Sequence, residues 1–308
     1  MADRLRVAPE AGRGDPAASH NPALPAIGAM LAAAALIAVT TLLAKILGRG
    51  LTGPELHPLQ VSAGRFCFAM LALVPVLVWR YPGFRGAAWP LHIGRSLCGW
   101  GGVTCLFAAA ALMPLAEATA ISFLSPLVTM LLAIALLRER VGPWRWTAAG
   151  LAMLGALVLI QPGSDAFQVA ALIALLAALL MGLEAIFIKR LSGREPPLRI
   201  LAINNAIGAT VAATAAAFVW IAPSPAQWAL LALLGVTMVI GQSFFIQAMK
   251  RADASFVMPV FYATLVFAAL YDLAVFGERP SVLAGVGAGL IVIGAVILAW
   301  REGRRARA

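Results

Sequence analysis

Charged side chains are scarce in this sequence. Asp, Glu, Lys and Arg make up 12% of the 308 residues, whereas soluble domains average about 25%. Hydrophobic residues make up 62%, and the mean hydropathy is +0.92. Apolar runs of about 20 residues, long enough to cross a bilayer, cover almost everything after residue 25. The composition excludes a soluble globular protein and predicts an integral membrane protein that acts within or across the lipid bilayer.

Residues suited to catalysis or metal binding are also few. The three cysteines, Cys67, Cys98 and Cys105, lie inside apolar runs without CxxC spacing, which argues against a disulfide framework or a zinc site. The three histidines are scattered, and the sequence has no HExxH, GxSxG or phosphate-binding motif. We therefore expect no enzyme activity, no metal and no cofactor.

The net charge of +10 is explained by membrane topology. Hydropathy predicts an all-α membrane protein with ten transmembrane helices. The predicted spans are roughly 26–47, 56–79, 90–112, 115–137, 143–161, 167–190, 198–221, 226–249, 253–276 and 281–300. With ten spans, the two tails and alternate linkers share one side, and that side holds most of the Lys and Arg residues. The opposite side holds only Lys45, Arg49 and Arg279. Because basic loops stay cytoplasmic, we expect both termini in the cytoplasm, a multi-pass protein of the inner (plasma) membrane, and no nucleic-acid partner.

An internal repeat organises the chain. The segment 113–163 consists of two apolar spans joined by Arg138, Glu139 and Arg140, and an offset of 139 residues brings Glu139-Arg140 onto Glu278-Arg279 without a gap. Five spans per half is an odd number, so the second half must cross the membrane in the opposite sense. The sequence thus predicts two inverted five-helix repeats, 26–163 and 164–300, between a flexible cytoplasmic tail (1–25) and a basic tail (301–308). Inverted repeats usually place a substrate site near the midplane, and we expect the paired hinges to turn the chain at the two surfaces without touching substrate.

Ionisable residues inside predicted spans form two tiers, and such residues often mark function. Arg95 and Glu184 lie toward the cytoplasmic side, and we predict that they help to close the inner mouth. Lys45 or Arg65 with Asp272 would close the outer one, beside Glu117 at similar depth. The alternative, for the outer residues and also for Arg95 and Glu184, is that they extend to the membrane surface and have no specific role.

The predicted middle of the membrane carries hydroxyls, amides and aromatic rings. Helical spacing gives Ser122 and Ser125 a common face with Thr129, beside Pro126. The other candidate substrate-binding residues are Thr41, Trp100, Thr104, Gln242 and Tyr262. Such a cavity suits a small amphipathic solute, and an aromatic amino acid could stack on Trp100 or Tyr262. Core packing or lipid contact is the alternative for both aromatic rings.

Two pairs of motifs resemble those of a known family. AEATAISFLSP (116–126) precedes LLRERVGPWRW (136–146), and RADASF (251–256) precedes VFGERP (275–280). The chain resembles, over roughly residues 26–300, the EamA-type carriers of the drug/metabolite transporter superfamily, including YddG-like amino acid exporters. The resemblance implies a cavity lined mainly by the first, third, fourth, sixth, eighth and ninth helices. Leu265 stands where the family often has a proline matching Pro126, so the two halves are expected to bend unequally.

The expected function is therefore export of small amphipathic metabolites, in the first place amino acids including aromatic ones, by alternating access around the midplane cavity. The expected partners are the small-molecule substrate and the lipid bilayer, with a monomer as the expected state. The first alternative is an importer of riboflavin or another flat cofactor. A membrane scaffold or an intramembrane enzyme is the alternative from outside transport.

Overall fold

The computed structural model describes residues 23–112, 121–160, 169–277 and 282–305. Apart from one short 3-10 turn, every regular element in these ranges is an α-helix, and no strand occurs in them. The N-terminal helices are α1 (Ala23–Gly48), α2 (Pro58–Trp79), α3 (Trp89–Leu112), α5 (Ser125–Leu137) and α6 (Pro143–Ile160). The C-terminal helices are α7 (Val169–Ser192), α8 (Pro197–Ala216), α9 (Pro225–Arg251), α10 (Ala254–Phe261), α11 (Ala263–Phe276) and α12 (Val282–Arg305), with η1 (Ala217–Val219) after α8.

The length and composition of these helices fit a membrane. Six segments of the described chain are long and apolar enough to cross one, and shorter apolar helices accompany them. Large apolar side chains such as Leu71, Leu172 and Phe218 are exposed on the outside of the bundle. A soluble protein could not present so much apolar surface to water.

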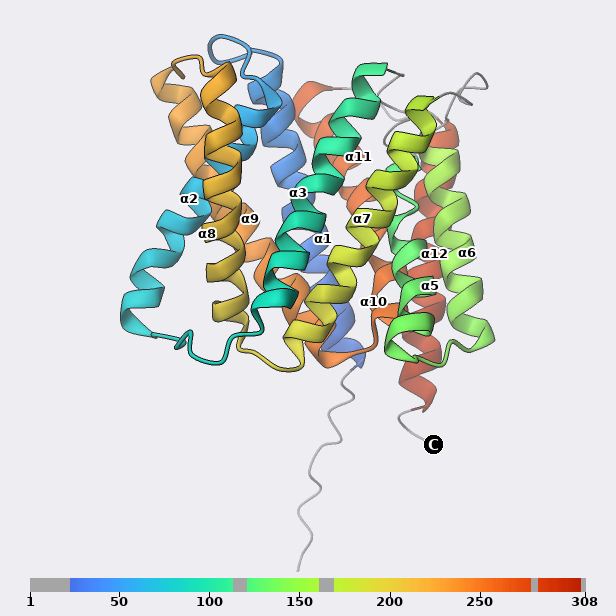
Figure 1. The fold of residues 1–308 in the computed structure, drawn as a ribbon. Helices are drawn as coiled ribbons and strands as arrows, with labels where there is room; N and C mark the ends of the chain where they lie inside the picture. The colour runs from blue at the N-terminus through green and yellow to red at the C-terminus, as the bar shows by residue number, and fades with distance from the viewer. Residues whose placement is uncertain (1–22, 113–120, 161–168, 278–281, 306–308) are drawn as a thin grey trace, which may run out of the picture.

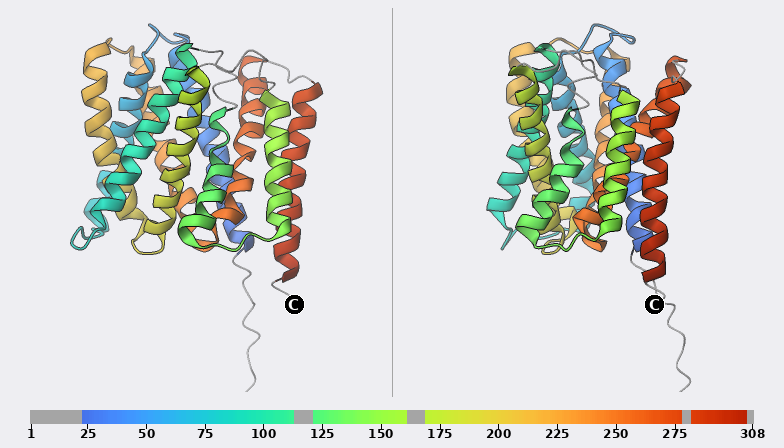
Figure 2. Two further views of the ribbon diagram at one scale, coloured as in Figure 1. Left: turned by 45° about the vertical axis from the view of Figure 1, so that its right-hand side comes forward. Right: turned by 90° about the vertical axis from the view of Figure 1, so that its right-hand side faces the viewer.

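The first and last described helices fix the orientation of the bundle. α1 begins, and α12 finishes, at the lower end of the molecule in Figure 1, and the two turned views in Figure 2 agree. We call this the terminal end and the opposite one the far end. The linkers after α2, α5, α7 and α9 also lie at the terminal end.

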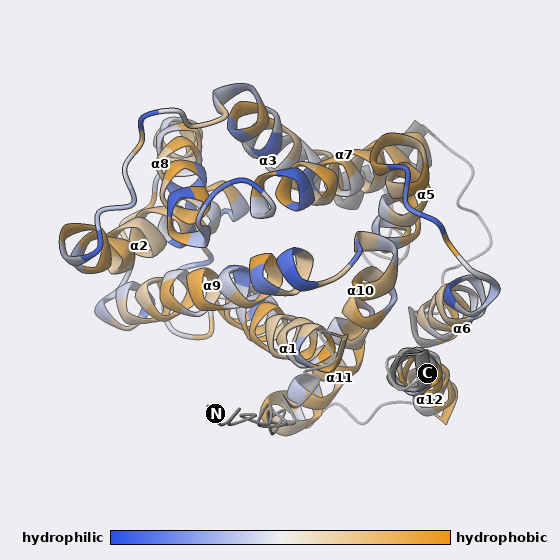
Figure 3. Cartoon of the chain, turned by 90° about the horizontal axis from the view of Figure 1, so that it is seen from below, coloured by the Kyte–Doolittle hydropathy of each residue, from blue (hydrophilic) through white to orange (hydrophobic). Residues whose placement is uncertain are grey.

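Helix packing follows a paired pattern. α1 packs along α9 and α3 along α7, while α1 also contacts α11 and α5 contacts α7. α2 packs against α8, and α6 pairs with α12 at one side of the bundle, as the view from the terminal end shows (Figure 3). Small residues permit the closest approach: a Cβ on Gly155 of α6 would lie 2.5 Å from the Gly287 carbonyl oxygen of α12.

Two helical segments are interrupted at positions 138 residues apart, within one residue of the 139-residue offset. α5 begins after Leu124 (φ −66°, ψ −17°), and α10 gives way to α11 at Tyr262 (φ −58°, ψ −18°). The backbone turns similarly at both places although Leu265 replaces the expected proline. Pro259 inside α10 removes a backbone donor in the second segment. Unequal bending of the two halves stays a prediction, because these angles describe one residue in each segment.

Candidate functional site

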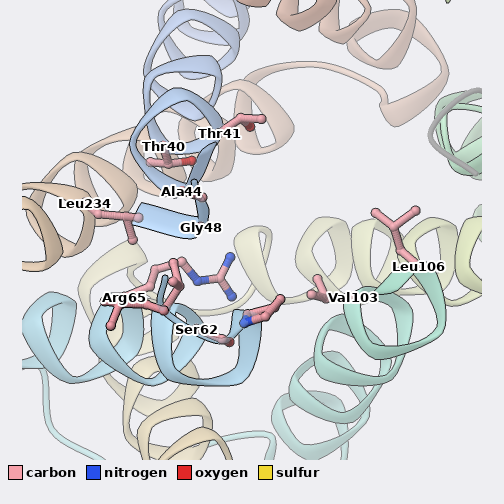
Figure 4. Close-up of a pocket in the computed structure, with 12 residues that line it drawn as sticks. Thr40, Thr41, Ala44, Gly48, Ser62, Arg65, Val103, Leu106 and Leu234 are labelled. Carbon is pink, nitrogen blue, oxygen red and sulfur yellow. The ribbon is translucent and has the colours of Figure 1, made fainter. Parts of the chain in front are cut away.

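A cavity of about 330 Å³ lies between α1, α2, α3 and α9. It extends from the far end, at Gly48 and Pro58, toward the middle of the bundle at Thr40 and Arg65. Most of its wall is apolar, as expected for ligand pockets, which span about 300–1,000 Å³. The lining residues are Thr40, Thr41, Ala44, Gly48, Leu56, Pro58, Val61, Ser62, Arg65, Val103, Leu106 and Leu234 (Figure 4).

The participation of α2 differs from the expected lining, which omitted the second helix. α2 can approach α9 closely because Gly64 has no side chain: a Cβ there would lie 2.6 Å from Leu231 Cδ2. This packing brings Ser62 and Arg65 into the cavity wall. Ser62 was not among the residues predicted from the sequence to bind substrate. Its position one helical turn before Arg65 was the one feature of the sequence that could have indicated its place in the cavity wall.

Arg65 carries the charge that lines this cavity. Its guanidinium points into the space between α1 and α3 (Figure 4) and lies 4.2 Å from the ring centroid of Phe66 on its own helix. Its Nε is buried and, within the described part of the chain, has no hydrogen-bond partner. A buried donor without a partner is costly, so this nitrogen is poised to bind an acceptor from a ligand.

Arg95 and Glu184 come together as the sequence predicted, from α3 and α7. Arg95 Nε lies 3.9 Å from Glu184 Oε1, and the Arg95 side chain is fully buried whereas Glu184 is 24% exposed. Gly99 makes room for the carboxylate, because a Cβ at this position would lie 2.8 Å from Glu184 Cδ. The charge of Arg65 also acts on Glu184. Arg95 therefore has a carboxylate partner in the centre of the bundle, and Arg65 is a more distant positive charge.

Polar groups of α8 lie beside Arg95 and Ser96. Arg95 donates to the Ile200 carbonyl at 3.2 Å, and Ser96 Oγ donates to Asn204 Oδ1 at 3.3 Å. Gln242 Oε1 is buried, with no partner among the described groups. Among the described groups, Arg65 and Arg95 therefore retain unsatisfied donors, and Gln242 of α9 retains an unsatisfied acceptor.

A set of polar contacts joins the two halves of the chain at the terminal end, and we call it the latch. Glu139, after α5, accepts hydrogen bonds from the backbone N–H groups of Ala254 and Ser255, both at 3.0 Å, and from Ser255 Oγ at 2.6 Å. Arg145 of α6 donates to Asp253 Oδ2 at 3.0 Å. Lys189 of α7 donates to the carbonyls of Met249 and Ala252. The start of α10 is therefore bound to the α5–α6 linker, where the carboxylate satisfies N–H groups of its first turn.

The latch adds a role to the hinge. The repeated motif was expected to turn the chain without touching substrate, and Glu139 in addition contacts residues 115 and 116 positions away. The recurrence of Glu139 as Glu278 in the second half could have indicated that this glutamate has a structural role. Glu278 and Arg279 lie outside the described residues, as does Glu117.

A second polar cluster joins α3 to the α7–α8 linker at the terminal end. Glu195 accepts from the Ala88 N–H at 2.6 Å and contacts His92 Nε2 at 2.9 Å, with Arg199 at 3.8 Å. Burial alone would raise the pKa of the Glu195 carboxyl, but the hydrogen bonds from Ala88 and His92 and the charges of His92 and Arg199 hold this pKa below its usual value. The cluster therefore favours the ionised carboxylate.

The predicted outer gate is only partly visible. Lys45 Nζ lies 4.5 Å from the ring centroid of Phe276, a cation–π contact between α1 and α11. The side chain of Asp272 lies outside the described residues, so its pairing with Lys45 or Arg65 stays a prediction. Arg65 itself lines the cavity described above.

The remaining predicted residues occupy different surroundings. Thr41 lines the cavity, whereas Thr104 donates to the Trp100 carbonyl of its own helix at 2.8 Å, and the Trp100 side chain is half-buried. Ser122 is buried, and the carbonyl of Ser125 accepts from Thr129 Oγ1. Tyr262 is 1% exposed.

Tyr262 belongs to a buried apolar cluster. Its hydroxyl lies 3.8 Å from the Met153 sulfur, and its ring packs 6.3 Å from that of Phe123. Ala152 and Leu265 complete this contact region. The structure thus brings Thr41 and Arg65 to one cavity and Arg95 and Glu184 to the centre, and places Tyr262 in the packing between α6 and the α10–α11 break.

Comparison with known proteins gives a consistent family match. The model of the EamA-like transporter family matches residues 24–161 and 168–300. The chain is 34% identical over 220 residues to a riboflavin transporter of Rhizobium johnstonii, covering 70% of this chain and 72% of the relative. It is 28% identical over 251 residues to an S-adenosylmethionine uptake transporter of Rickettsia prowazekii, covering 81% and 85%.

Two further proteins are similar to this chain. A pseudopaline exporter of Pseudomonas aeruginosa is 28% identical over 211 residues, covering 68% of this chain and 74% of the relative. A solved crystal structure of a protein 21% identical superposes with a TM-score of 0.76 over 92% of this chain and 98% of that one. At this identity, the last likeness shows a shared fold.

Proposed function

The chain belongs to the EamA-like transporter family, and from that premise we propose that it carries a small amphipathic solute bearing a carboxylate across the inner membrane. An amino acid, including an aromatic one, is the proposed solute. The observation that supports this choice is Arg65, a buried cation with an unpartnered Nε in a largely apolar cavity. Arginine matches carboxylate geometry, and the apolar wall accommodates a hydrophobic side chain.

Alternating access is the proposed mechanism. The packing of α1 on α9 matches that of α3 on α7 when the halves 26–163 and 164–300 are exchanged, which supports ten spans in two inverted five-helix repeats. The cavity extends to the far end while the latch joins the halves at the terminal end. With both termini in the cytoplasm, as the basic linkers favour, we assign this arrangement to an outward-facing state.

The proposed transport cycle requires the latch to open. Substrate carboxylate bound by Arg65 would neutralise the excess positive charge that Arg65 and Arg95 present to Glu184. The halves would then rock, breaking the Glu139–α10 contacts and opening the terminal end. Export is the direction that the resemblance to amino acid exporters supports, with cytoplasmic substrate entering when the latch is open.

Riboflavin uptake is the second candidate, and the 34% identity to a riboflavin transporter favours it. Riboflavin has no carboxylate, so it would leave Arg65 without a carboxylate partner. S-adenosylmethionine belongs in the same test because of the relatives that take it up.

Counterflow in proteoliposomes distinguishes these candidates. Vesicles loaded with unlabelled phenylalanine, S-adenosylmethionine or riboflavin are diluted into the matching labelled solute, with protein-free vesicles as the control. We expect phenylalanine to accumulate. Accumulation of riboflavin alone would replace the proposed substrate. The assay is then repeated with the solute on one side of the membrane only, with and without a proton gradient. These measurements give the direction of transport and show whether transport is coupled to protons.

A further inference from the structure

A second cavity, of about 790 Å³, lies outside the central site, between the terminal-end halves of α2, α8 and α9. Apolar side chains form most of its wall, among them Leu73, Val76, Leu201 and Ile240. Three polar residues, Arg80, Ser243 and Gln247, also line it. We call this cavity the α2 groove.

The sequence of α2 explains why the groove exists. Close contact holds the far-end half of α2 on its neighbours, because Gly208 and Gly235 lack side chains where Phe66 and Phe68 pack. Pro75 lies inside α2 further along, and proline kinks a helix. The terminal-end part of α2 then runs outward from α8, as Figure 1 shows.

Charge complementarity identifies the occupant. Arg80 lines the groove, with its guanidinium 4.7 Å from the ring centroid of Trp79. Gln247, on the opposite wall, accepts a hydrogen bond from Arg251 at 3.3 Å. The nearby carboxylate of Glu195 is engaged by His92 and Arg199. The mouth of the groove is therefore positively charged, and its interior is apolar.

We propose that the α2 groove binds an anionic phospholipid of the cytoplasmic leaflet. One acyl chain lies among the apolar side chains of α2, α8 and α9, and the headgroup phosphate binds Arg80, with Arg251 adding attraction. Basic residues at the cytoplasmic surface favour anionic lipid in this way. A lipid in this position fills the space beside the kinked part of α2 and stabilises the outward-facing packing of α2 on α9.

Thermal unfolding of the full chain in detergent tests this site. Midpoints are measured during titration with phosphatidylglycerol, with phosphatidylcholine of the same acyl chains, and with glycerol 3-phosphate as the headgroup alone. We expect phosphatidylglycerol to raise the midpoint and the other two to have little effect. Equal shifts with phosphatidylglycerol and phosphatidylcholine would overturn the proposal, and so would a full shift with glycerol 3-phosphate.

Three variants locate the binding. Arg80→Gln should weaken the apparent affinity for phosphatidylglycerol about fivefold, the equivalent of about 1 kcal/mol per surface arginine. Arg85→Gln is the matched control, since Arg85 is exposed in the linker after α2 and does not line the groove. Ile240→Trp fills the groove without a change of charge and should abolish the shift. Equal responses of the Arg80 and Arg85 variants, or an unchanged response of Ile240→Trp, would refute a defined site.

Discussion

The latch should set the balance between outward-facing and inward-facing states, and Glu139→Gln is the perturbation that tests it. The Glu139 carboxylate accepts three hydrogen bonds, from two backbone N–H groups and the Ser255 hydroxyl. Glutamine keeps one acceptor oxygen, and its amide group cannot accept from the second N–H. Arg145 and Lys189 keep their own contacts.

The expected magnitude follows from these contacts. Hydrogen bonds to a charged group contribute about 1.5–3 kcal/mol, and an anion at a helix N-terminus adds about 0.3–1 kcal/mol. A loss of about 2–3 kcal/mol changes the ratio of closed to open states by about 30- to 150-fold. A protein that is closed about 99% of the time would become close to an even mixture.

Double electron–electron resonance measures this ratio in nanodiscs. Spin labels at Arg140→Cys and Lys250→Cys, both exposed at the terminal end, report the separation of the α5–α6 linker from the end of α9. Cys67, Cys98 and Cys105 are first replaced by alanine. We expect Glu139→Gln to add a population at longer distance.

Arg194→Gln also removes a charge at the terminal end, but Arg194 is exposed in the α7–α8 linker outside the latch. This variant should keep the distance distribution of the parent. If Glu139→Gln gives the parent distribution too, the latch does not hold the terminal end closed.

Two further predictions concern stability. Gly155→Ala should lower the thermal midpoint of unfolding, because its Cβ would meet backbone atoms of α12 and overpacking costs about 1–3 kcal/mol. Gly150→Ala is the control on the same helix: open space surrounds this position, so the variant should be neutral or stabilising. Equal midpoints for the two variants would contradict the α6–α12 packing. Because the pKa of Glu195 is lowered in the folded state, its ionised carboxylate stabilises the folded protein. This contribution is complete above the carboxyl's ordinary pKa of about 4.3. It is lost as the pH falls through the lowered pKa of the folded state. Unfolding midpoints measured from neutral pH into this acid range should therefore converge for the parent and Glu195→Gln, and a constant difference would refute the assignment.

The sequence was informative where a local pattern determines structure. Apolar runs marked the helices, because a span needs about 20 apolar residues. The depth of Arg95 and Glu184 along their helices placed both charges at one level, and the structure pairs them. Intramembrane charges seek partners, so this contact was within reach of sequence reasoning.

Other features depended on helix rotation and long-range contact. The sequence could not tell which side of its helix Tyr262 would occupy, and the ring packs against Phe123. The position of Arg65 along its predicted span led to its interpretation as an outer-gate residue. The direction of its side chain depends on the approach of α2 to α9, which the sequence did not reveal. The Glu139 contacts depend on the docking of α10, which local hydropathy does not encode.

Arg65 provides the most direct test of the proposed transport function. Counterflow of an amino acid and of its carboxamide analogue is compared in the parent and in Arg65→Gln, with Arg49→Gln as a control for a far-end charge. We predict that the parent prefers the carboxylate about tenfold or more, as expected for a charge-assisted hydrogen bond, and that Arg65→Gln loses this preference. A variant that transports the amino acid as well as the parent, with the same discrimination against the amide, would contradict the account.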